Sequence, residues 1–331
     1  MTENNKIGYS FPIDLVYMWV DGNDPAWRKK RSQYAPVVNN ASSQTMAEAR
    51  WRNNDELRFS LRSVEKFASW INHIYIITDD QRPEWLRADH PKITIIDHSQ
   101  IIPADALPVF NSSAIESCIY KIPGLSEHFI IGNDDTLFSA HVSPSTFFNN
   151  DGRPIVRLNR LNRFLWGSKG NYSRMVRHMQ DMVKEDCGKL IPYAPHHNFD
   201  AYRKSDFEYC VSLHKEAWDK TAYSRFRQNN DMHRSYVSYY TIATKRADFR
   251  RVGRYNRIAG IWNLIQATIR GKYANDSRCI RLNKMDFNAA LKKYNPLMIC
   301  MNDNERSTEA DCKRMVDFLM SMFPSKCQFE K

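Results

Sequence analysis

Two adjacent carboxylates, Asp134 and Asp135, follow directly on a short apolar run. The run, residues 129–131, is typical of a buried strand and ends abruptly at Gly132 and Asn133. Acids at the carboxyl end of a strand lie where α/β sheets place their ligands. Adjacent carboxylates repel each other, and a divalent cation that holds a phosphate commonly offsets this repulsion. The alternative is an ordinary acidic turn with both side chains in water.

A third carboxylate, Glu116, comes shortly before this pair in the sequence. Residues 115–122 carry apolar side chains at helical spacing, and Ser112 or Ser113 can cap the helix. Glu116 then lies at or near the position that closes a capping box. The other interpretation is a general base held near Asp134 and Asp135. The spacing alone leaves both interpretations open.

Acids also end the other predicted strands. Apolar runs at residues 13–20, 73–78 and 93–96 stop at acidic residues, namely Asp21, Asp79 and Asp97. Segments of helical length separate these runs, and residues 55–70 have the pattern of an amphipathic helix. The alternation predicts an α/β fold: a mostly parallel sheet flanked by helices, with acids along its carboxyl edge.

The chain after residue 150 is markedly basic. Lysines and arginines crowd residues 153–177 and 245–284 with few opposing acids, and they include Arg250, Arg251 and Arg254. One interpretation is a solvated surface. The other is a surface that binds lipid phosphates or a phosphorylated polymer, since each basic residue near an anionic surface contributes about 1 kcal/mol. Near the C-terminus, residues 298–304 resemble another strand with an acidic end, and residues 310–322 a helix.

Composition restricts the class of protein. The 331 residues carry a net charge of +11, which points to nucleic acid, an anionic membrane or phosphorylated substrates as partners. The seven cysteines are scattered and form no CxxC pair, which predicts reduced thiols. The nearest approach to a membrane span, residues 258–269, is interrupted by Asn263 and Gln266. The first six residues are polar, unlike a signal peptide. We expect a cytoplasmic protein, soluble or peripheral at the inner face of the cytoplasmic membrane.

Four blocks of this sequence resemble the Stealth proteins, bacterial polysaccharide phosphotransferases related to the catalytic subunit of N-acetylglucosamine-1-phosphotransferase. They include Asn-Ser-Ser-Ala-Ile-Glu at residues 111–116 and Asn-Asp-Asp at residues 133–135, and the four blocks span residues 14–25, 54–85, 107–135 and 300–330. There are two departures. Asp79 and Asp80 stand where the family usually has Gly or Asn-Gly, and Ile131-Gly132 where it has an aromatic residue. Because Asp adopts a positive φ less readily than Gly, the turn at Asp79 is expected to differ.

The resemblance implies the reaction. A sugar-1-phosphate passes from a nucleotide-sugar to a hydroxyl of a glycan or lipid-linked oligosaccharide, which forms a phosphodiester and releases a nucleoside monophosphate in capsule or exopolysaccharide synthesis. Mg²⁺ or Mn²⁺ is the implied cofactor. We accordingly divide the chain into three parts: residues 1–150 bind the nucleotide-sugar, residues 151–290 form a basic, largely helical region facing acceptor or membrane, and residues 291–331 return to the active site.

Residue-by-residue matching places the family's active-site positions on Glu116, Asp135, His196 and Arg227. As hypotheses, Asp135 and Asp303 bind the metal or a phosphate, Arg227 contacts the β-phosphate, and Glu116 or His196 acts as the base. Six further residues are expected to bind substrate: Asp21, Gly22, Arg62, Asn111, Asn133 and Asn302.

Two other functions compete with this one. A GT-A-like glycosyltransferase would attack the anomeric carbon and release a nucleoside diphosphate, and only the family blocks disfavour it. A nucleic-acid-binding protein would suit the charge of +11. Its recognised motifs are missing from the sequence, however, and carboxylates at strand ends repel phosphate unless a metal is bound. We therefore expect no nucleic-acid partner.

Overall fold

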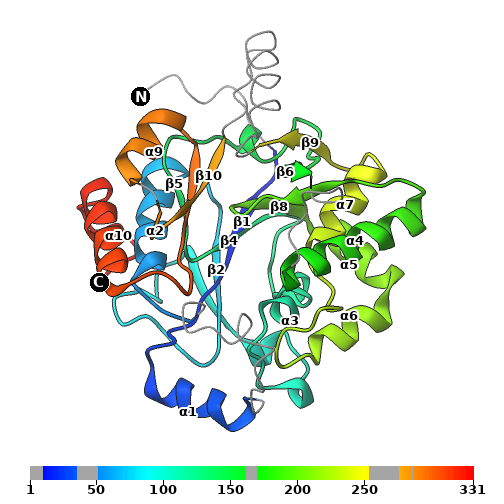
Figure 1. The fold of residues 1–331 in the computed structure, drawn as a ribbon, viewed down its shortest axis with the longest axis horizontal. Helices are drawn as coiled ribbons and strands as arrows, with labels where there is room; N and C mark the ends of the chain where they lie inside the picture. The colour runs from blue at the N-terminus through cyan, green and yellow to red at the C-terminus, as the bar shows by residue number, and fades with distance from the viewer. Residues whose placement is uncertain (1–9, 36–50, 162–169, 253–275, 285) are drawn as a thin grey trace.

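The computed structural model describes residues 10–35, 51–161, 170–252, 276–284 and 286–331 (Figure 1). A five-stranded sheet of order β3-β2-β1-β4-β8 forms its centre. The first four strands are parallel, whereas β8 pairs antiparallel with β4. These strands are β1 (Ile13–Met18), β2 (Ile74–Thr78), β3 (Ile93–Asp97), β4 (His128–Asn133) and β8 (Asp200–Arg203). The predicted α/β fold with a mostly parallel sheet is confirmed.

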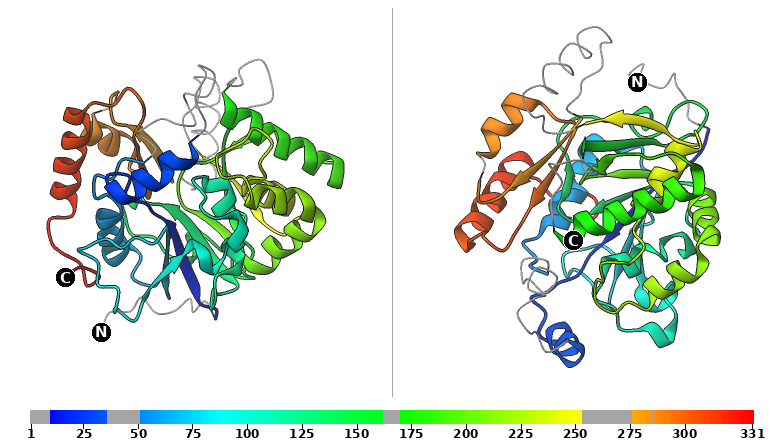
Figure 2. Two further views of the ribbon diagram at one scale, coloured as in Figure 1. Left: turned by 90° about the horizontal axis from the view of Figure 1, so that it is seen from below. Right: turned by 45° about the vertical axis from the view of Figure 1, so that its right-hand side comes forward.

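Two hydrophobic layers cover the two faces of this sheet, because successive side chains of a strand point in opposite directions. Leu15 and Tyr17 of β1 pack in one layer with Leu57 and Leu61 of α2. Val16 belongs to the other layer, which gathers the helices of the middle of the chain (Figure 2). In chain order, the helices up to residue 243 are α1 (Pro25–Tyr34), α2 (Glu56–Phe67), α3 (Ser112–Glu116), α4 (Asn171–Cys187), α5 (Lys204–Leu213), α6 (Lys215–Ala222) and α7 (Ser235–Ala243).

A second sheet, of order β10-β11-β5, brings the C-terminal part of the chain to the central sheet. It consists of β5 (Thr136–Phe138), β10 (Ser277–Arg281) and β11 (Met298–Asn302), and it packs with α9 (Phe287–Tyr294) and α10 (Glu309–Met322). Because β5 begins directly after Asp135, its pairing with β11 places Met301 beside that residue. The Met301 N–H donates to the Asp135 carbonyl oxygen at 2.8 Å.

A third sheet, of order β7-β6-β9, lies in the basic part of the chain and contains β6 (Ile155–Leu161), β7 (Tyr193–Pro195) and β9 (Asp248–Arg251). Acids contact several of its arginines: Asp276 is 3.0 Å from Arg157 and 2.5 Å from Arg250. The interrupted apolar stretch at 258–269 and Arg254 lie outside the described residues. Among the residues that are described, no helix combines the length and apolar character needed to cross a membrane. All seven cysteines are free thiols, as predicted.

The turn after β2 departs from the family pattern in sequence but adopts a left-handed conformation all the same. Asp80 has a φ of 54°. Its N–H donates to Asp97 Oδ2 at 2.7 Å, and this hydrogen bond ties the end of β2 to the end of β3. Aspartate reaches this region of φ at a cost that its surroundings must offset. The proposed three-part division of the chain stays a prediction.

Candidate active site

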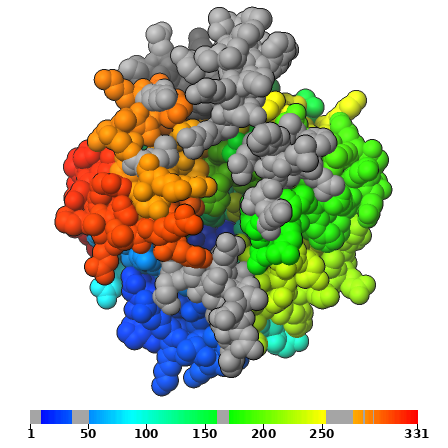
Figure 3. Space-filling view, viewed as in Figure 1, coloured from blue at the N-terminus to red at the C-terminus, as the bar shows by residue number. Residues whose placement is uncertain are grey.

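Segments far apart in the sequence meet at the carboxyl ends of β1 and β4. The sheet order changes direction around β1, and in such sheets the crevice outside the strand ends is where ligands bind. Figure 3 shows this face of the molecule hollowed near its centre, between the orange C-terminal segment and the green middle of the chain. Residues from at least five segments contribute side chains to the two clusters described next.

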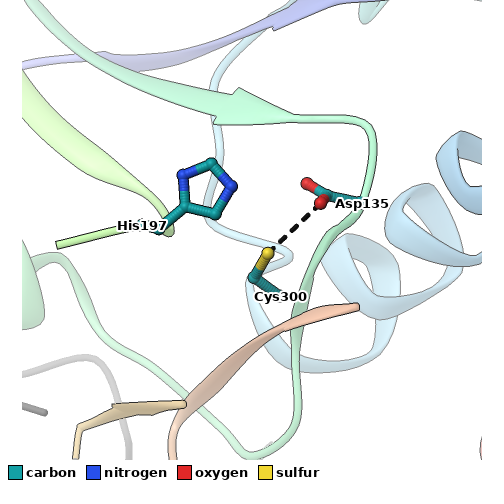
Figure 4. Close-up of side chains that lie close together, drawn as sticks. All are labelled: Asp135, His197 and Cys300. Carbon is teal, nitrogen blue, oxygen red and sulfur yellow. Dashed lines mark hydrogen bonds between the residues drawn. The ribbon is translucent and has the colours of Figure 1, made fainter. Parts of the chain in front are cut away.

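The first cluster surrounds Asp135. One atom each of Asp135, His197 and Cys300 lies within 4.8 Å of the other two, and all three side chains point toward a common centre (Figure 4). The Cys300 thiol donates to Asp135 Oδ2 at 3.2 Å. The other carboxylate oxygen, Oδ1, is buried, and none of the described residues donates a hydrogen bond to it. Asp135 comes from the β4–β5 turn, Cys300 from β11, and His197 from the segment after β7.

Two further carboxyl groups adjoin Asp135, so like charges crowd one place. Burial raises the pKa of Glu56 to about 7, hydrogen bonds from Asn54 oppose the shift, and the Asp135 charge adds to it. Burial and the charges of Asp135 and Glu56 likewise raise the pKa of Asp134. Burial raises the pKa of Asp135 itself, against the opposing effect of His197. Without a cation these carboxyl groups therefore hold protons more tightly than free acids do.

The second cluster surrounds Glu116, which is 4% exposed. Its Oε1 lies 3.2 Å from Arg234 Nη1, and its Oε2 lies 3.7 Å from His233 Nε2. Burial alone would raise the pKa of Glu116, but Arg234, His233 and Arg227 outweigh it and hold the pKa below its usual value. The carboxylate is therefore charged at neutral pH.

The capping interpretation of Glu116 is wrong. Helix α3 spans Ser112–Glu116, and its N-cap is Asn111, whose side chain accepts a hydrogen bond from the Ser113 N–H. Neither serine caps the helix. Because Glu116 ends this short helix, its side chain is free to point toward Arg234, 118 residues further along the chain.

Contacts with the segment before α3 hold Arg227 in place. The Phe110 N–H donates to the Arg225 carbonyl oxygen at 2.8 Å, and the Phe110 and Phe226 rings stack with centroids 5.4 Å apart. The Arg227 guanidinium then donates to Ser112 Oγ at the start of α3. Its Nε atom is buried and has no hydrogen-bond partner in the part of the chain that the structure describes. This arrangement presents a cation with spare donor capacity on the side of the site that carries Glu116.

The two adjacent histidines have different surroundings. His196 is 4% exposed, and burial together with Arg157 and His197 lowers its pKa to about 3. It is therefore neutral at neutral pH. His197 is partly exposed, and its ring lies beside Asp135. Burial lowers the pKa of His197 too, while the Asp135 charge opposes the shift.

Of the other predicted substrate-binding residues, some lie at the carboxyl ends of strands and some have contacts within the fold. Asn133 and Asn302 end β4 and β11 and are partly exposed. The Asp21 N–H donates to Gln81 Oε1 at 2.9 Å, which links the turns after β1 and β2. Gly22 has a packing role, since a Cβ atom there would lie 1.9 Å from the Trp51 carbonyl oxygen.

The contacts of three predicted residues serve the fold. Arg62 makes two hydrogen bonds to Glu330, at 2.6 and 2.8 Å, and so ties α2 to the C-terminus. Asn111 is 1% exposed and donates to Asp231 Oδ2 at 2.8 Å. Asp303 forms an ion pair with Arg52 at 2.8 Å, although its charge also acts on Asp135. Roles for these residues in metal or substrate binding stay predictions.

Sequence reasoning missed several members of the site. Glu56 begins a predicted helix and looks like an ordinary first-turn acid, and His233 and Arg234 stand in a polar segment without a periodic pattern. Asp200 begins β8, and its carboxylate lies 3.4 Å from the Arg234 guanidinium. Burial raises the pKa of Asp200 to about 7, although the positive charge of Arg234 opposes this shift. Only the adjacency of His233 and Arg234 to the matched Arg227 could have drawn attention to them.

The residues around Asp135 suit a divalent cation. The partnerless Oδ1 atom and the crowded carboxyl groups of Asp134 and Glu56 would each gain from a positive charge. Oxygen ligands favour Mg²⁺ or Mn²⁺. The nitrogen of His197 and the sulfur of Cys300 are softer ligands, which favour a transition metal over Mg²⁺.

Two models of one protein family match parts of this chain. Residues 11–36 match the family model described as Stealth protein CR1, conserved region 1, and residues 50–156 match Stealth protein CR2, conserved region 2. These two regions contain Glu56, Glu116 and Asp135.

Relatives extend the similarity beyond those regions. The chain is 32% identical to exopolysaccharide phosphotransferase cps2G of Lactiplantibacillus plantarum, over 97% of both chains. It is 29% identical to receptor polysaccharide phosphotransferase WefC of Streptococcus gordonii, over 96% of this chain and 98% of that one. It is 34% identical to exopolysaccharide phosphotransferase SCO6021 of Streptomyces coelicolor, of which it spans 57%.

Proposed function

The chain belongs to the Stealth family, and we propose that it transfers a sugar-1-phosphate from a nucleotide-sugar to a hydroxyl of a glycan or lipid-linked acceptor. The product is a phosphodiester in a capsular or extracellular polysaccharide, and the leaving group is a nucleoside monophosphate. The observation that carries the proposal is that His197, beside Asp135, also lies within reach of the charges of Glu116, Arg227 and Arg234, so the two clusters adjoin. A relative that matches this chain over its full length is named a phosphotransferase.

The chemistry follows from the charges. Attack on a phosphorus atom surrounded by charged oxygens requires positive charge and in-line positioning more than covalent catalysis. The acceptor oxygen forms a bond to the β-phosphorus, and the bond from that phosphorus to the bridging oxygen breaks. Arg227, with its partnerless Nε, supplies positive charge for the phosphates.

Of the two candidate bases, Glu116 has more support. Its carboxylate is charged, and no described residue donates a hydrogen bond to Oε2, so this oxygen can take the proton of the acceptor hydroxyl. The lowered pKa of Glu116 and the pKa of about 3 of His196 make both groups weak bases in the free protein, but His196 is also enclosed beside Arg157, whose charge opposes its protonation. We propose that His196 orients or hydrogen-bonds substrate as a neutral imidazole.

A divalent cation, Mg²⁺ or Mn²⁺, would bind at Asp135 with help from Asp134 or Glu56, and His197 and Cys300 adjoin the same position. Such an ion supplies Lewis-acid stabilisation of charge on the phosphate oxygens. Arg234 stays committed to Glu116 and Asp200, and so holds the base in position.

We also propose reversible attachment to an anionic membrane surface, supported by the net charge of +11. The described arginines of the basic region add little support, because Arg157, Arg203 and Arg250 each contact an acid. Co-sedimentation with anionic but not zwitterionic vesicles, lost at about 0.5 M salt, is the expected result. Sedimentation with both kinds of vesicle, or with neither, contradicts the proposal.

The test of the function is the identity of the released nucleotide. The protein is incubated with UDP-, GDP- and CDP-sugars and Mg²⁺ in the presence of a glycan acceptor. A nucleoside monophosphate that appears only with acceptor supports the proposal. A nucleoside diphosphate instead supports the glycosyltransferase alternative.

A further inference from the structure

A cavity of about 380 Å³ lies beside the proposed active site, at the carboxyl ends of β2 and β3. Asp79 and His98, which follow these two strands, line it together with Tyr34 of α1 and the Leu107-Pro108 pair. Lys30 and Gln33 of α1 line it too, so the cavity combines an aromatic and apolar wall with polar groups from α1 and from the strand ends. Small-molecule sites commonly combine these two features.

Two polar atoms at the strand ends have no hydrogen-bond partner among the described residues: Asp79 Oδ2 and His98 Nδ1. Their residues are only 8% and 6% exposed, and His98 Nδ1 lies 4.0 Å from Asp79 Oδ1. The other Asp79 oxygen pairs with Lys30 Nζ at 2.9 Å. Buried polar atoms normally have hydrogen-bond partners, because a buried donor or acceptor without a partner costs free energy. Two such atoms at one cavity therefore indicate a ligand that offers hydrogen bonds.

The position of the cavity in the sheet indicates which ligand. In the NAD-binding sheets whose strands run 3-2-1-4, an acid at the end of the second strand accepts a hydrogen bond from the ribose 2′-hydroxyl. The order β3-β2-β1-β4 and the place of Asp79 directly after β2 repeat that arrangement. With strands about 4.8 Å apart, the boundary of β2 and β3 lies roughly 12 Å from β4. A nucleoside at that boundary would extend its phosphates past β1 toward Asp135.

We propose that this cavity binds the nucleoside of the donor, with the ribose hydroxyls on Asp79 and the base between Tyr34 and the Leu107-Pro108 wall. The inference rests on the proposed function for the identity of the ligand as a nucleotide-sugar. Tyr34 is 42% exposed, and the Arg225 guanidinium lies 4.5 Å from its ring centroid, which fixes the orientation of the ring. An exposed aromatic face of this kind stacks on a base without selecting its identity.

Calorimetric titration of the full chain tests the inference directly. The probes are UMP, CMP, GMP and AMP, the 2′-deoxy form of whichever binds most tightly, and inorganic phosphate. Asp79→Asn and Tyr34→Ala should each weaken the tightest mononucleotide by about tenfold or more, and Asp79→Asn should remove the preference for ribose over deoxyribose. Because Tyr34 is largely exposed, its variant is expected to fold normally.

Matched controls come from a pair outside the cavity. Asp105 and Tyr223 are both exposed and contact each other at 2.9 Å, so Asp105→Asn and Tyr223→Ala should leave mononucleotide binding within about twofold of the wild type. With a donor substrate, the two cavity variants should raise KM and leave kcat nearly unchanged, because the cavity is remote from the reacting phosphorus.

The results separate this inference from the proposed function. Unchanged mononucleotide affinity in both cavity variants overturns the inference, even if the protein transfers sugar-1-phosphate. Failure of all four mononucleotides to bind the wild type overturns it as well. If mononucleotide binding depends on Asp79 and Tyr34 but the released product is a nucleoside diphosphate, the cavity assignment stands and the proposed reaction fails.

Discussion

Replacing Glu56 by Gln should stabilise the protein at alkaline pH and destabilise it slightly at acidic pH. Glu56 begins α2, is 4% exposed, and accepts hydrogen bonds from the backbone and side-chain nitrogens of Asn54 at 2.6 and 2.7 Å. Burial raises its pKa from 4.5 to about 7 in spite of those bonds, and the nearby Asp135 charge contributes. The folded protein therefore binds this proton more tightly than the unfolded chain does.

The sign and size follow from linkage. When folding raises the pKa of an acid, the protein loses no stability at pH values below the unfolded pKa of 4.5. The loss of stability grows as the pH rises toward the folded pKa of about 7. This rise in the pKa of Glu56 corresponds to a loss of about 3 kcal/mol in the free energy of unfolding above pH 8. Glutamine removes that cost but loses one acceptor for Asn54, worth about 1 kcal/mol. The variant should thus gain about 2 kcal/mol of stability at pH 8 and lose about 1 kcal/mol at pH 4.5.

Thermal unfolding at the two pH values, with EDTA present, provides the assay. At about 2 °C per kcal/mol, Tm of the variant should be about 4 °C above wild type at pH 8 and about 2 °C below it at pH 4.5. Glu185→Gln, at an exposed position of α4, is the control and should shift Tm little at either pH. A Tm difference of the same sign and size at both pH values would refute the view that Asp134, Asp135 and Glu56 crowd negative charge.

Three further sets of substitutions test separate parts of the account. Turnover should fall about 10²-fold or more, with circular dichroism unchanged, in each of Glu116→Gln, Asp135→Asn, His196→Ala and Arg227→Ala. Arg62→Leu should lower the free energy of unfolding by about 2 kcal/mol, because the buried Glu330 carboxylate keeps Arg58 alone as its ion-pair partner, and Arg62→Leu with Glu330→Leu should recover part of that loss. Asn111→Ala should cost about 2 kcal/mol of stability and lower turnover, since the cap of α3 and the bond to Asp231 are lost together; an unchanged Tm contradicts that view.

The four parallel strands of the central sheet, β1 to β4, were predictable because each is an apolar run followed by an acid. Residues 13–20 and 73–78 contain β1 and β2, and α2 lies within the predicted helix at 55–70. Strand β8 was not predictable. Its four residues are Asp200 to Arg203, with charges at both ends, and its place beside β4 is set by tertiary contacts with no periodic signal.

The site was predictable at residues that end a strand and unpredictable where partners come from distant segments. Asp135 was identified from the apolar run before it. The ion pair of Glu116 with Arg234 joins residues 118 apart, and no local pattern in the sequence encodes it. The histidines show a further limit: matching selected His196, whereas the neighbouring His197 lies beside Asp135, and only the fold decides which of two adjacent side chains faces the carboxylate.

The position of the donor's β-phosphorus after reaction tests the central claim most directly. A nucleotide-sugar labelled with ³²P at the β-phosphate is incubated with the protein, Mg²⁺ and a glycan acceptor, and the products are separated. The proposed reaction predicts that the label moves to the glycan in a phosphodiester, with an unlabelled nucleoside monophosphate as the other product. Label retained in a nucleoside diphosphate, with an unlabelled sugar on the glycan, would contradict it.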